Sequence, residues 1–234
     1  MENKYLFYHI PKTAGSSFTV LLKSIFGKEF IVNLNRLSGS NKDIVDAHKE
    51  DKVICGHFNN LGEVKNVFND RFSIVFLREP VTRFISQYYH EIKVKMDNGE
   101  KVGEPNLYSY TKSLLKYSFF KAVNPTVNTQ TCLLSNGDVT GAYRKFKQAK
   151  RNLAKFSFVG LTETADESIK LFLEKAKITT DEQLQEVNVG IYKHENSTNK
   201  ILITLIRFLN RFDIKLYNYA VKLYEFQKHE IESL

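Results

Sequence analysis

Residues 5–18 read YLFYHIPKTAGSSF, an apolar strand pattern that passes through a turn of small residues into a helical pattern. We expect a strand at Tyr5–His9 and a helix at Ser16–Phe26. Small residues in the turn let backbone N–H groups approach an anion, and the helix start offers unpaired N–H groups and the positive end of its dipole. Because Lys12 adds a full positive charge, the stretch predicts a phosphate-binding loop.

A second strand-to-helix junction follows in the chain. Phe72–Leu77 is a continuous apolar run, which is typical of a buried parallel strand, and Pro80 stands where a first helical residue is expected. Arg78 at the strand end and Ser86, about two turns into the helix, could converge on one phosphate, because a guanidinium offers paired donors and a hydroxyl adds another. The sequence therefore predicts a second anion-binding strand end.

The two blocks together resemble the sulfotransferases that use 3′-phosphoadenosine 5′-phosphosulfate (PAPS). Residues 9–17, HIPKTAGSS, resemble the 5′-phosphosulfate loop of the membrane-type, carbohydrate-modifying branch. Residues 78–89, REPVTRFISQYY, resemble its 3′-phosphate element, Arg-Asp-Pro-x-x-Arg-x-x-Ser-x-Tyr, with Glu79 in place of the aspartate. The resemblance implies that PAPS is bound by Lys12, Thr13, Ala14, Gly15, Ser16, Ser17, Arg78 and Ser86.

Further segments extend the resemblance over most of the chain. Residues 128–135, NTQTCLLS, are similar to a family stretch Asn-x-Gln-Thr-Arg-x-Leu-Ser, and residues 158–163, FVGLTE, to a family strand end. Cys132 stands where that stretch often has arginine, so any anion contact of the arginine is not carried over. Residues 212–220 resemble the family's closing helix, to which we assign packing alone.

Simpler interpretations exist for each block. The first turn could be a tight connection only, and Arg78 could be the ion-pair partner of Glu79 or Glu91. The loop is also not a Walker A sequence, because Lys12 precedes Gly15 instead of following a glycine directly. The two blocks in the order that the family uses favour the functional interpretation, since each supplies the context that the other needs.

The catalytic prediction concerns the proton of the acceptor. Sulfonate transfer is an in-line displacement, in which the acceptor oxygen loses a proton while charge builds on the departing phosphate oxygen. Lys12 is placed to neutralise that oxygen. For the base we favour His57, which follows the apolar strand Val53–Gly56 and resembles a Gly-His of some carbohydrate-modifying members. The competing candidates are His9, Glu79 and His90.

The alternation of strands and helices, with ligands at strand ends, predicts an α/β fold with an open, mainly parallel sheet flanked by helices, similar to P-loop kinases. The C-terminal half is helix-rich, and 234 residues with 42% hydrophobic content fit one domain over residues 1–234. Beyond the elements named above, we expect helices at Pro80–Met96, Leu107–Phe120, Val127–Leu134 and Ala142–Lys155, a strand at Phe156–Gly160, and helices from Thr164, Asn199 and Asp213.

The net charge of +8 favours anionic ligands. Residues 143–155 carry six basic side chains and no acid on an expected helix. They could contact an acidic glycan or a membrane headgroup layer, but we favour a solvated helix face. Nucleic acid is not expected as a partner, because the aromatic residues fall mainly at core-like spacing.

The leading hypothesis is a PAPS-dependent sulfotransferase acting on a hydroxyl, which we expect to belong to a carbohydrate or glycan. A sulfonate carries less negative charge than a γ-phosphate, so we expect no metal ion. The alternatives are a nucleotide-dependent phosphotransferase of the P-loop kinase class, which lacks both the Walker spacing and a strand-end aspartate for Mg²⁺ here, and a non-enzymatic polyanion-binding module.

The sequence also bears on the compartment. It shows no charged leader with an apolar run, no apolar run of about eighteen residues, and two cysteines, Cys55 and Cys132, that suggest no disulfide framework. We therefore expect a cytoplasmic protein without a transmembrane segment. A Golgi luminal domain separated from its anchor is the alternative, since animal members of the branch usually have an N-terminal membrane helix. The oligomeric state stays open.

Overall fold

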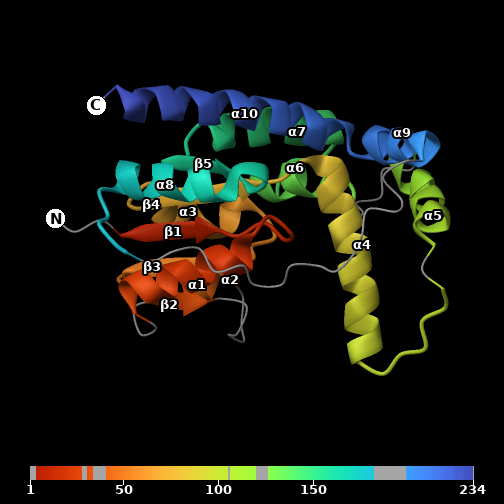
Figure 1. The fold of residues 1–234 in the computed structure, drawn as a ribbon, viewed down its shortest axis with the longest axis horizontal. Helices are drawn as coiled ribbons and strands as arrows, with labels where there is room; N and C mark the ends of the chain where they lie inside the picture. The colour runs from red at the N-terminus through yellow and green to blue at the C-terminus, as the bar shows by residue number, and fades with distance from the viewer. Residues whose placement is uncertain are drawn as a thin grey trace.

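Five parallel strands form one sheet in the order β2-β3-β1-β4-β5 in the computed structural model, which describes residues 4–27, 31–33, 41–104, 106–119, 126–181 and 199–233. The strands are β1 (Tyr5–Tyr8), β2 (Ile31–Asn33), β3 (Val53–Gly56), β4 (Phe72–Leu77) and β5 (Phe158–Leu161). Tyr8 is opposite both Gly56 and Val75, so β1 lies at the centre between β3 and β4. In Figure 1, β1 starts beside the N-terminus and runs toward α4, and the carboxyl ends of the strands therefore face that helix.

Helices cover the sheet and extend beyond its carboxyl edge. They are α1 (Gly15–Phe26), α2 (Asn41–Ala47), α3 (Lys65–Phe68), α4 (Pro80–Asp97), α5 (Leu107–Phe119), α6 (Thr129–Leu134), α7 (Ala142–Leu153), α8 (Ala165–Ala176), α9 (Lys200–Leu209) and α10 (Arg211–Glu232), with short 3₁₀ turns η2 (Leu61–Val64) and η3 (Thr162–Thr164). Helices α10 and α7 lie along the β5 side, and α5 and α9 lie beyond α4 (Figure 1). None of the helices in the described ranges has both the length and the apolar character of a membrane span.

The main core surrounds the sheet, because its strands are buried on both faces. Aromatic rings tie the central strands to the covering helices. Phe18 of α1 packs on Phe76 of β4 with ring centres 4.9 Å apart and on Phe172 of α8 at 5.2 Å. Such contacts hold α1 against the sheet and so fix the place of the loop that precedes it.

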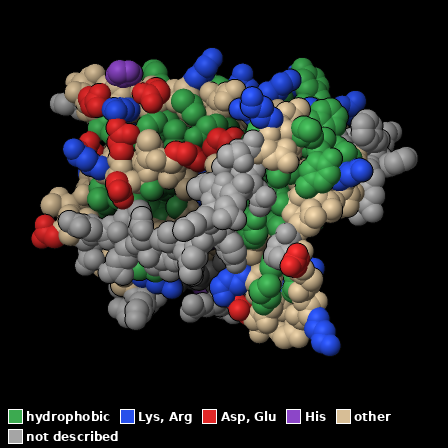
Figure 2. Space-filling view, turned by 45° about the vertical axis from the view of Figure 1, so that its right-hand side comes forward, with side chains coloured by type: hydrophobic (Ala, Val, Ile, Leu, Met, Phe, Trp, Pro, Cys, Tyr) green, Lys and Arg blue, Asp and Glu red, His purple; other side chains and the backbone are tan. Residues whose placement is uncertain are grey.

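A smaller second core joins α4, α5 and α9. Phe84 of α4 and Ile206 and Leu209 of α9 are fully buried in it. Its outer surface nevertheless leaves Ile201 66% and Phe208 43% exposed. Hydrophobic side chains are correspondingly visible at the right of Figure 2.

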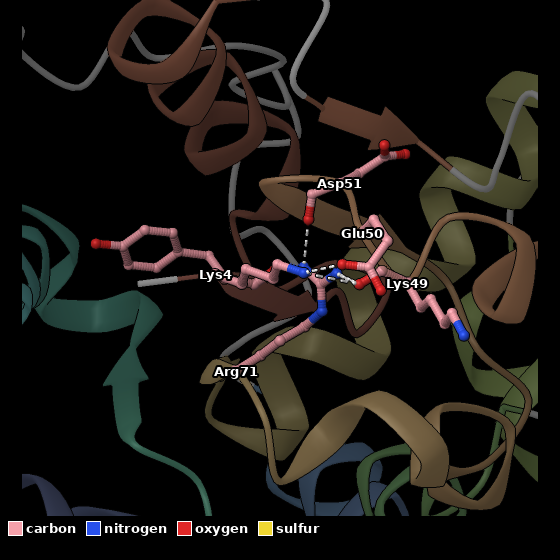
Figure 3. A network of polar contacts seen from close by, with 6 residues as sticks. Lys4, Lys49, Glu50, Asp51 and Arg71 are labelled. Carbon is pink, nitrogen blue, oxygen red and sulfur yellow. Dashed lines mark hydrogen bonds and ion pairs between the residues drawn. The ribbon is translucent and has the colours of Figure 1, made fainter. Parts of the chain in front are cut away.

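Arg71 forms hydrogen bonds at the amino edge of the sheet (Figure 3). Its Nη1 donates to the carbonyl oxygens of Tyr5 (3.1 Å) and Asp51 (2.8 Å), and its Nη2 donates to that of Lys49 (2.7 Å). The side chain is only 6% exposed, and burial lowers its pKa. Arg71 thus joins β1 to the turn before β3 by donating to three backbone carbonyl groups.

The expected open parallel α/β sheet is confirmed, and the four strands that were expected and the longer helices lie close to their expected positions. Two of the boundaries that differ from those expected have visible reasons. The last strand is Phe158–Leu161, because Phe156 instead packs edge-on against Phe68. Helix α6 starts after Asn128, whose left-handed φ of 50° cannot belong to a helix.

Other boundaries shifted by a residue or two, and several short elements were not expected. Helix α1 begins at Gly15 and α7 ends at Leu153. The unexpected elements are β2, α2, η2, α3 and η3. The single-domain assignment stays a prediction.

Candidate functional site

Three neighbouring strand ends meet at the carboxyl edge of the sheet. The loop after β1 carries Lys12, His57 follows β3, and Arg78 follows β4. Both flanking residues are bonded to the central loop: Arg78 Nη1 donates to the Lys12 carbonyl (3.3 Å), and His57 Nδ1 bonds the His9 carbonyl (2.8 Å). The sheet therefore brings together residues that the sequence analysis drew from separate segments.

The loop after β1 has a constrained backbone. Lys12 and Ala14 both have left-handed φ values, 68° and 61°, which cost a residue with a side chain roughly 1–2 kcal/mol each. Between them, the fully buried Thr13 donates from Oγ1 to the carbonyl of Ile10 (2.8 Å). The Thr13 hydroxyl is therefore used inside the loop, and only the backbone N–H of this residue is left for a ligand.

The start of α1 suits an anion. In the described structure, this helix has neither a side-chain cap nor an acidic residue in its first turn. Its first N–H groups and its dipole therefore attract negative charge. Ser16 is exposed at this end, whereas Ser17 is 7% exposed, so Ser16 has the more accessible hydroxyl.

Gly15 is required by a close approach of His9. A Cβ atom at position 15 would lie 1.9 Å from both Cδ2 and Nε2 of the His9 ring, which no side chain can tolerate. The His9 ring also stacks on Phe7, with ring centres 5.4 Å apart. The glycine thus lets a buried histidine pack directly on the first turn of α1.

Two positive charges share this small region. Burial lowers the pKa of Lys12, and the nearby positive charge of Arg78 lowers it further. Burial also lowers the pKa of Arg78, while Glu163 and Glu79 act in the opposite direction. Neither cation forms an ion pair within the described residues, and an anion between them would reduce their repulsion.

A glutamine that the sequence analysis did not select holds the backbone of Arg78. The Gln130 Oε1 atom accepts from the Arg78 N–H (3.0 Å), and its Nε2 donates to the Arg78 carbonyl (3.0 Å). Gln130 is fully buried, and its own N–H donates to Asp213 Oδ2 (3.1 Å), as the Thr131 N–H does to Oδ1 (2.7 Å). The only sequence signal was the similarity of residues 128–135 to a family stretch, which gave no role.

Helix α4 turns one face toward the loop. The charge of Lys12 contributes to the lowered pKa of the exposed His90, after desolvation, so His90 lies on the loop side. Ser86 precedes His90 by four positions and so shares that face. The Glu79 carboxylate caps the helix by accepting from the Thr82 N–H (2.8 Å).

Arg83 of α4 adds a buried charge near Arg78. Arg83 is 1% exposed, and its Nη2 donates to the Thr126 carbonyl (3.1 Å) and to Thr129 Oγ1 (2.9 Å). Its Nε and Nη1 atoms have no hydrogen-bond partner in the described part of the chain. Burial lowers the pKa of Arg83, the negative charge of the buried Asp213 opposes this, and the charge of Arg78 lowers the pKa again, so Arg83 lies near both groups.

The bond to His9 fixes the tautomer of His57. A carbonyl oxygen can only accept, so Nδ1 of His57 carries the proton, and Nε2 of the neutral ring is an acceptor. Burial lowers the pKa of His57, partly offset by this bond, and the ring is therefore neutral at neutral pH. The His9 ring lies 4.1 Å from the His57 ring, between centres.

The other candidate bases have different surroundings. Burial, followed by the charges of His57 and Lys12, lowers the pKa of His9 to about 3, and its ring is only 7% exposed. The Glu79 carboxylate caps α4. His90 is exposed on α4. His57 is the candidate that combines a fixed neutral tautomer with partial exposure, and it is bonded to the loop that carries Lys12.

The chain belongs to the sulfotransferase family, whose family model matches residues 1–226. The resemblance inferred from the motifs is thereby confirmed. A crystal structure of a sulfotransferase from Alicyclobacillus acidocaldarius is similar with a TM-score of 0.48 and 14% identity, over 96% of each chain. No curated protein matches the chain. Among the described residues, no cluster of three histidine, cysteine or acidic side chains could hold a metal ion.

Proposed function

We propose that this sulfotransferase takes its sulfonate from PAPS and transfers it to a hydroxyl group of a carbohydrate or glycan. The observation that carries the donor assignment is the contact between Arg78 and the backbone of Lys12, because it joins the two anion-binding strand ends. PAPS has a 5′-phosphosulfate and a 3′-phosphate, and one nucleotide would therefore occupy both.

In this proposal, the donor lies across the carboxyl edge of the sheet. The 5′-phosphosulfate binds the N–H groups at the start of α1, together with Lys12 and the hydroxyl of Ser16. The 3′-phosphate binds Arg78 and Ser86. The remaining loop residues, Thr13, Ala14, Gly15 and Ser17, contribute backbone N–H groups and hold the loop in shape.

The transfer step balances in one displacement. The acceptor oxygen forms a bond to sulfur while the bond from sulfur to the 5′-phosphate oxygen breaks, and adenosine 3′,5′-bisphosphate leaves. The Nε2 atom of His57 takes the proton of the acceptor, since its Nδ1 proton is engaged with His9. Lys12 stabilises the negative charge that develops on the departing oxygen.

The test of the donor site is calorimetric titration with adenosine 3′,5′-bisphosphate, followed by turnover with labelled PAPS and a panel of sugar acceptors. Lys12→Ala should lower kcat by about 10²–10³ with the circular dichroism spectrum unchanged. The matched control is Lys170→Ala, which removes an exposed lysine of α8 and should leave kcat unchanged. Full turnover by Lys12→Ala would contradict the role of Lys12, and absence of bisphosphate binding would contradict PAPS as the donor.

A further inference from the structure

Helix α9 presents apolar side chains on two sides. Those buried against α4 and α5 are Leu202, Ile206 and Leu209. On the outer side, Ile201 is 66% and Phe208 43% exposed, with the half-buried Leu205 between them. Spacings of four and three residues place these three on one helix face. Because the outer side of a helix on a globular protein is normally polar, this apolar stripe calls for a partner.

Contacts of a guanidinium group and of aromatic rings connect the apolar stripe of α9 to side chains of α10 and α7. The Arg211 guanidinium lies over Phe208 (5.1 Å to the ring centre) and over Phe212 (5.0 Å). Phe212 contacts Phe146 of α7, with ring centres 6.0 Å apart, and Phe146 contacts the 55% exposed Tyr143 at 6.5 Å. We call the exposed side chains of residues 143–151 and 200–215 the basic-apolar face.

This face has charge of one sign. Its exposed basic residues are Arg144, Lys147, Lys150, Arg151, Lys200, Arg207 and Lys215, and the half-buried Lys145 and Arg211 lie in the same segments. The same segments contain one acid, Asp213, which is fully buried. In Figure 2, Lys and Arg side chains accordingly lie among hydrophobic ones at the upper right, over α9 and the start of α10, whereas acidic side chains lie further left or lower.

We propose that the basic-apolar face docks on the surface of an anionic lipid bilayer. Basic side chains would contact lipid phosphates, while Ile201, Phe208 and Tyr143 would enter the boundary between headgroups and acyl chains. Residues 143–151 alone would fit a solvated helix face. The exposed apolar stripe beside them favours a bilayer over an acidic glycan, because a glycan offers anions but no apolar layer.

Vesicle co-sedimentation of the full chain tests this proposal. The protein should sediment with vesicles of phosphatidylcholine and phosphatidylserine, more weakly as salt rises, and not with phosphatidylcholine alone. The double variant Ile201→Ser/Phe208→Ser should lower the partition coefficient roughly tenfold or more, because two apolar side chains no longer enter the bilayer. Lys200→Gln/Arg207→Gln should lower it by on the order of tenfold, since it removes two exposed charges.

The matched control is Phe226→Ser on α10. Phe226 is 66% exposed, like Ile201, but has Glu225 beside it in the sequence and lines a surface hollow with Glu230. This variant should sediment like the parent chain. Absence of sedimentation with anionic vesicles, even if the protein is retained on heparin, would overturn the proposal, and so would unchanged partition of the Ile201→Ser/Phe208→Ser variant. Thermal melting of every variant confirms that a loss of partition is not a loss of fold.

Discussion

At the scale of single residues, the His9 carbonyl does what a carboxylate often does beside a catalytic histidine. It accepts the Nδ1 proton of His57 and leaves Nε2 as the acceptor. Unlike a carboxylate, the carbonyl has no net charge, so it stabilises a protonated His57 only weakly. Burial therefore prevails, and the pKa of His57 is lowered.

This arrangement predicts the pH dependence of transfer. A general base must be neutral, and protonation at low pH removes it. Because the pKa of His57 lies below its ordinary value of 6.5, kcat/KM should decline at low pH, with its half-maximal point below pH 6.5. His57→Ala should lower kcat by about 10²–10⁴ and abolish this decline, as steady-state kinetics over pH would show.

Two controls separate His57 from its neighbours. His90→Ala should change neither kcat nor the decline of kcat/KM at low pH (the acid limb of the pH profile), because the proposal gives this exposed side chain no role in proton transfer. His9 cannot produce the limb, since its pKa of about 3 is too low. An acid limb that persists in His57→Ala would assign the base to another group.

Gln130 provides a second prediction at this scale. Gln130→Met keeps the side-chain volume but removes both bonds to the Arg78 backbone. The guanidinium should then be less well positioned, and we expect KM for the donor to rise about tenfold with a smaller change in kcat. Gln148→Met is the matched control, because Gln148 bonds the Asn136 N–H away from the site. A tenfold loss of kcat with an unchanged KM for the donor would argue against a positioning role of Gln130.

Some residues of the candidate site could be predicted from the sequence, and others could not. Lys12, Arg78 and His57 could be predicted because each follows an apolar strand, and parallel strand ends meet at one edge. The internal use of the Thr13 hydroxyl could not, since it depends on the left-handed turns beside it. Nor could Gln130, whose partner lies in a segment that becomes close only after folding.

At the scale of elements, long patterns were predictable and short ones were not. The apolar runs of β3 and β4 gave their exact bounds because buried strands leave a continuous signal. The strand β2 has three residues, and α2 and α3 have seven and four, which is too short for a periodic pattern to stand out.

The prediction at this scale concerns Arg71 and the strand β1 that it holds. Arg71→Ala removes three hydrogen bonds that tie β1 to the turn before β3 at the amino edge, and it should lower the free energy of unfolding by about 2–4 kcal/mol in urea denaturation. Affinity for adenosine 3′,5′-bisphosphate in the folded variant should not change, because the site lies at the other edge.

The matched control at this edge is Lys4→Ala. Lys4 forms an ion pair with Glu50 (2.6 Å), but both side chains are exposed, and solvent screens such pairs. The variant should therefore unfold at nearly the same urea concentration as the parent chain. A similar loss of stability in both variants would mean that general charge at this edge, and not the buried bonds of Arg71, holds it together.

At the scale of the whole molecule, ligand binding should be visible as stability. If the bisphosphate binds the folded chain only, a concentration of 100 times Kd adds about 2.7 kcal/mol and should raise Tm by about 5–10 °C. Lys12→Ala should show a smaller rise at the same concentration, as differential scanning fluorimetry would measure. An equal rise in both would place the bisphosphate elsewhere.

The hydrogen bonds around Arg78 have a consequence for biosynthesis. Its backbone is bonded by Gln130, and the N–H of Gln130 is bonded in turn by Asp213 of α10. A nascent chain that has emerged from the ribosome only as far as β4 already contains the three strand ends, yet it lacks the groups that keep the guanidinium in place. The chain would thus be able to bind the nucleotide only late in translation, after α10 has packed against α6.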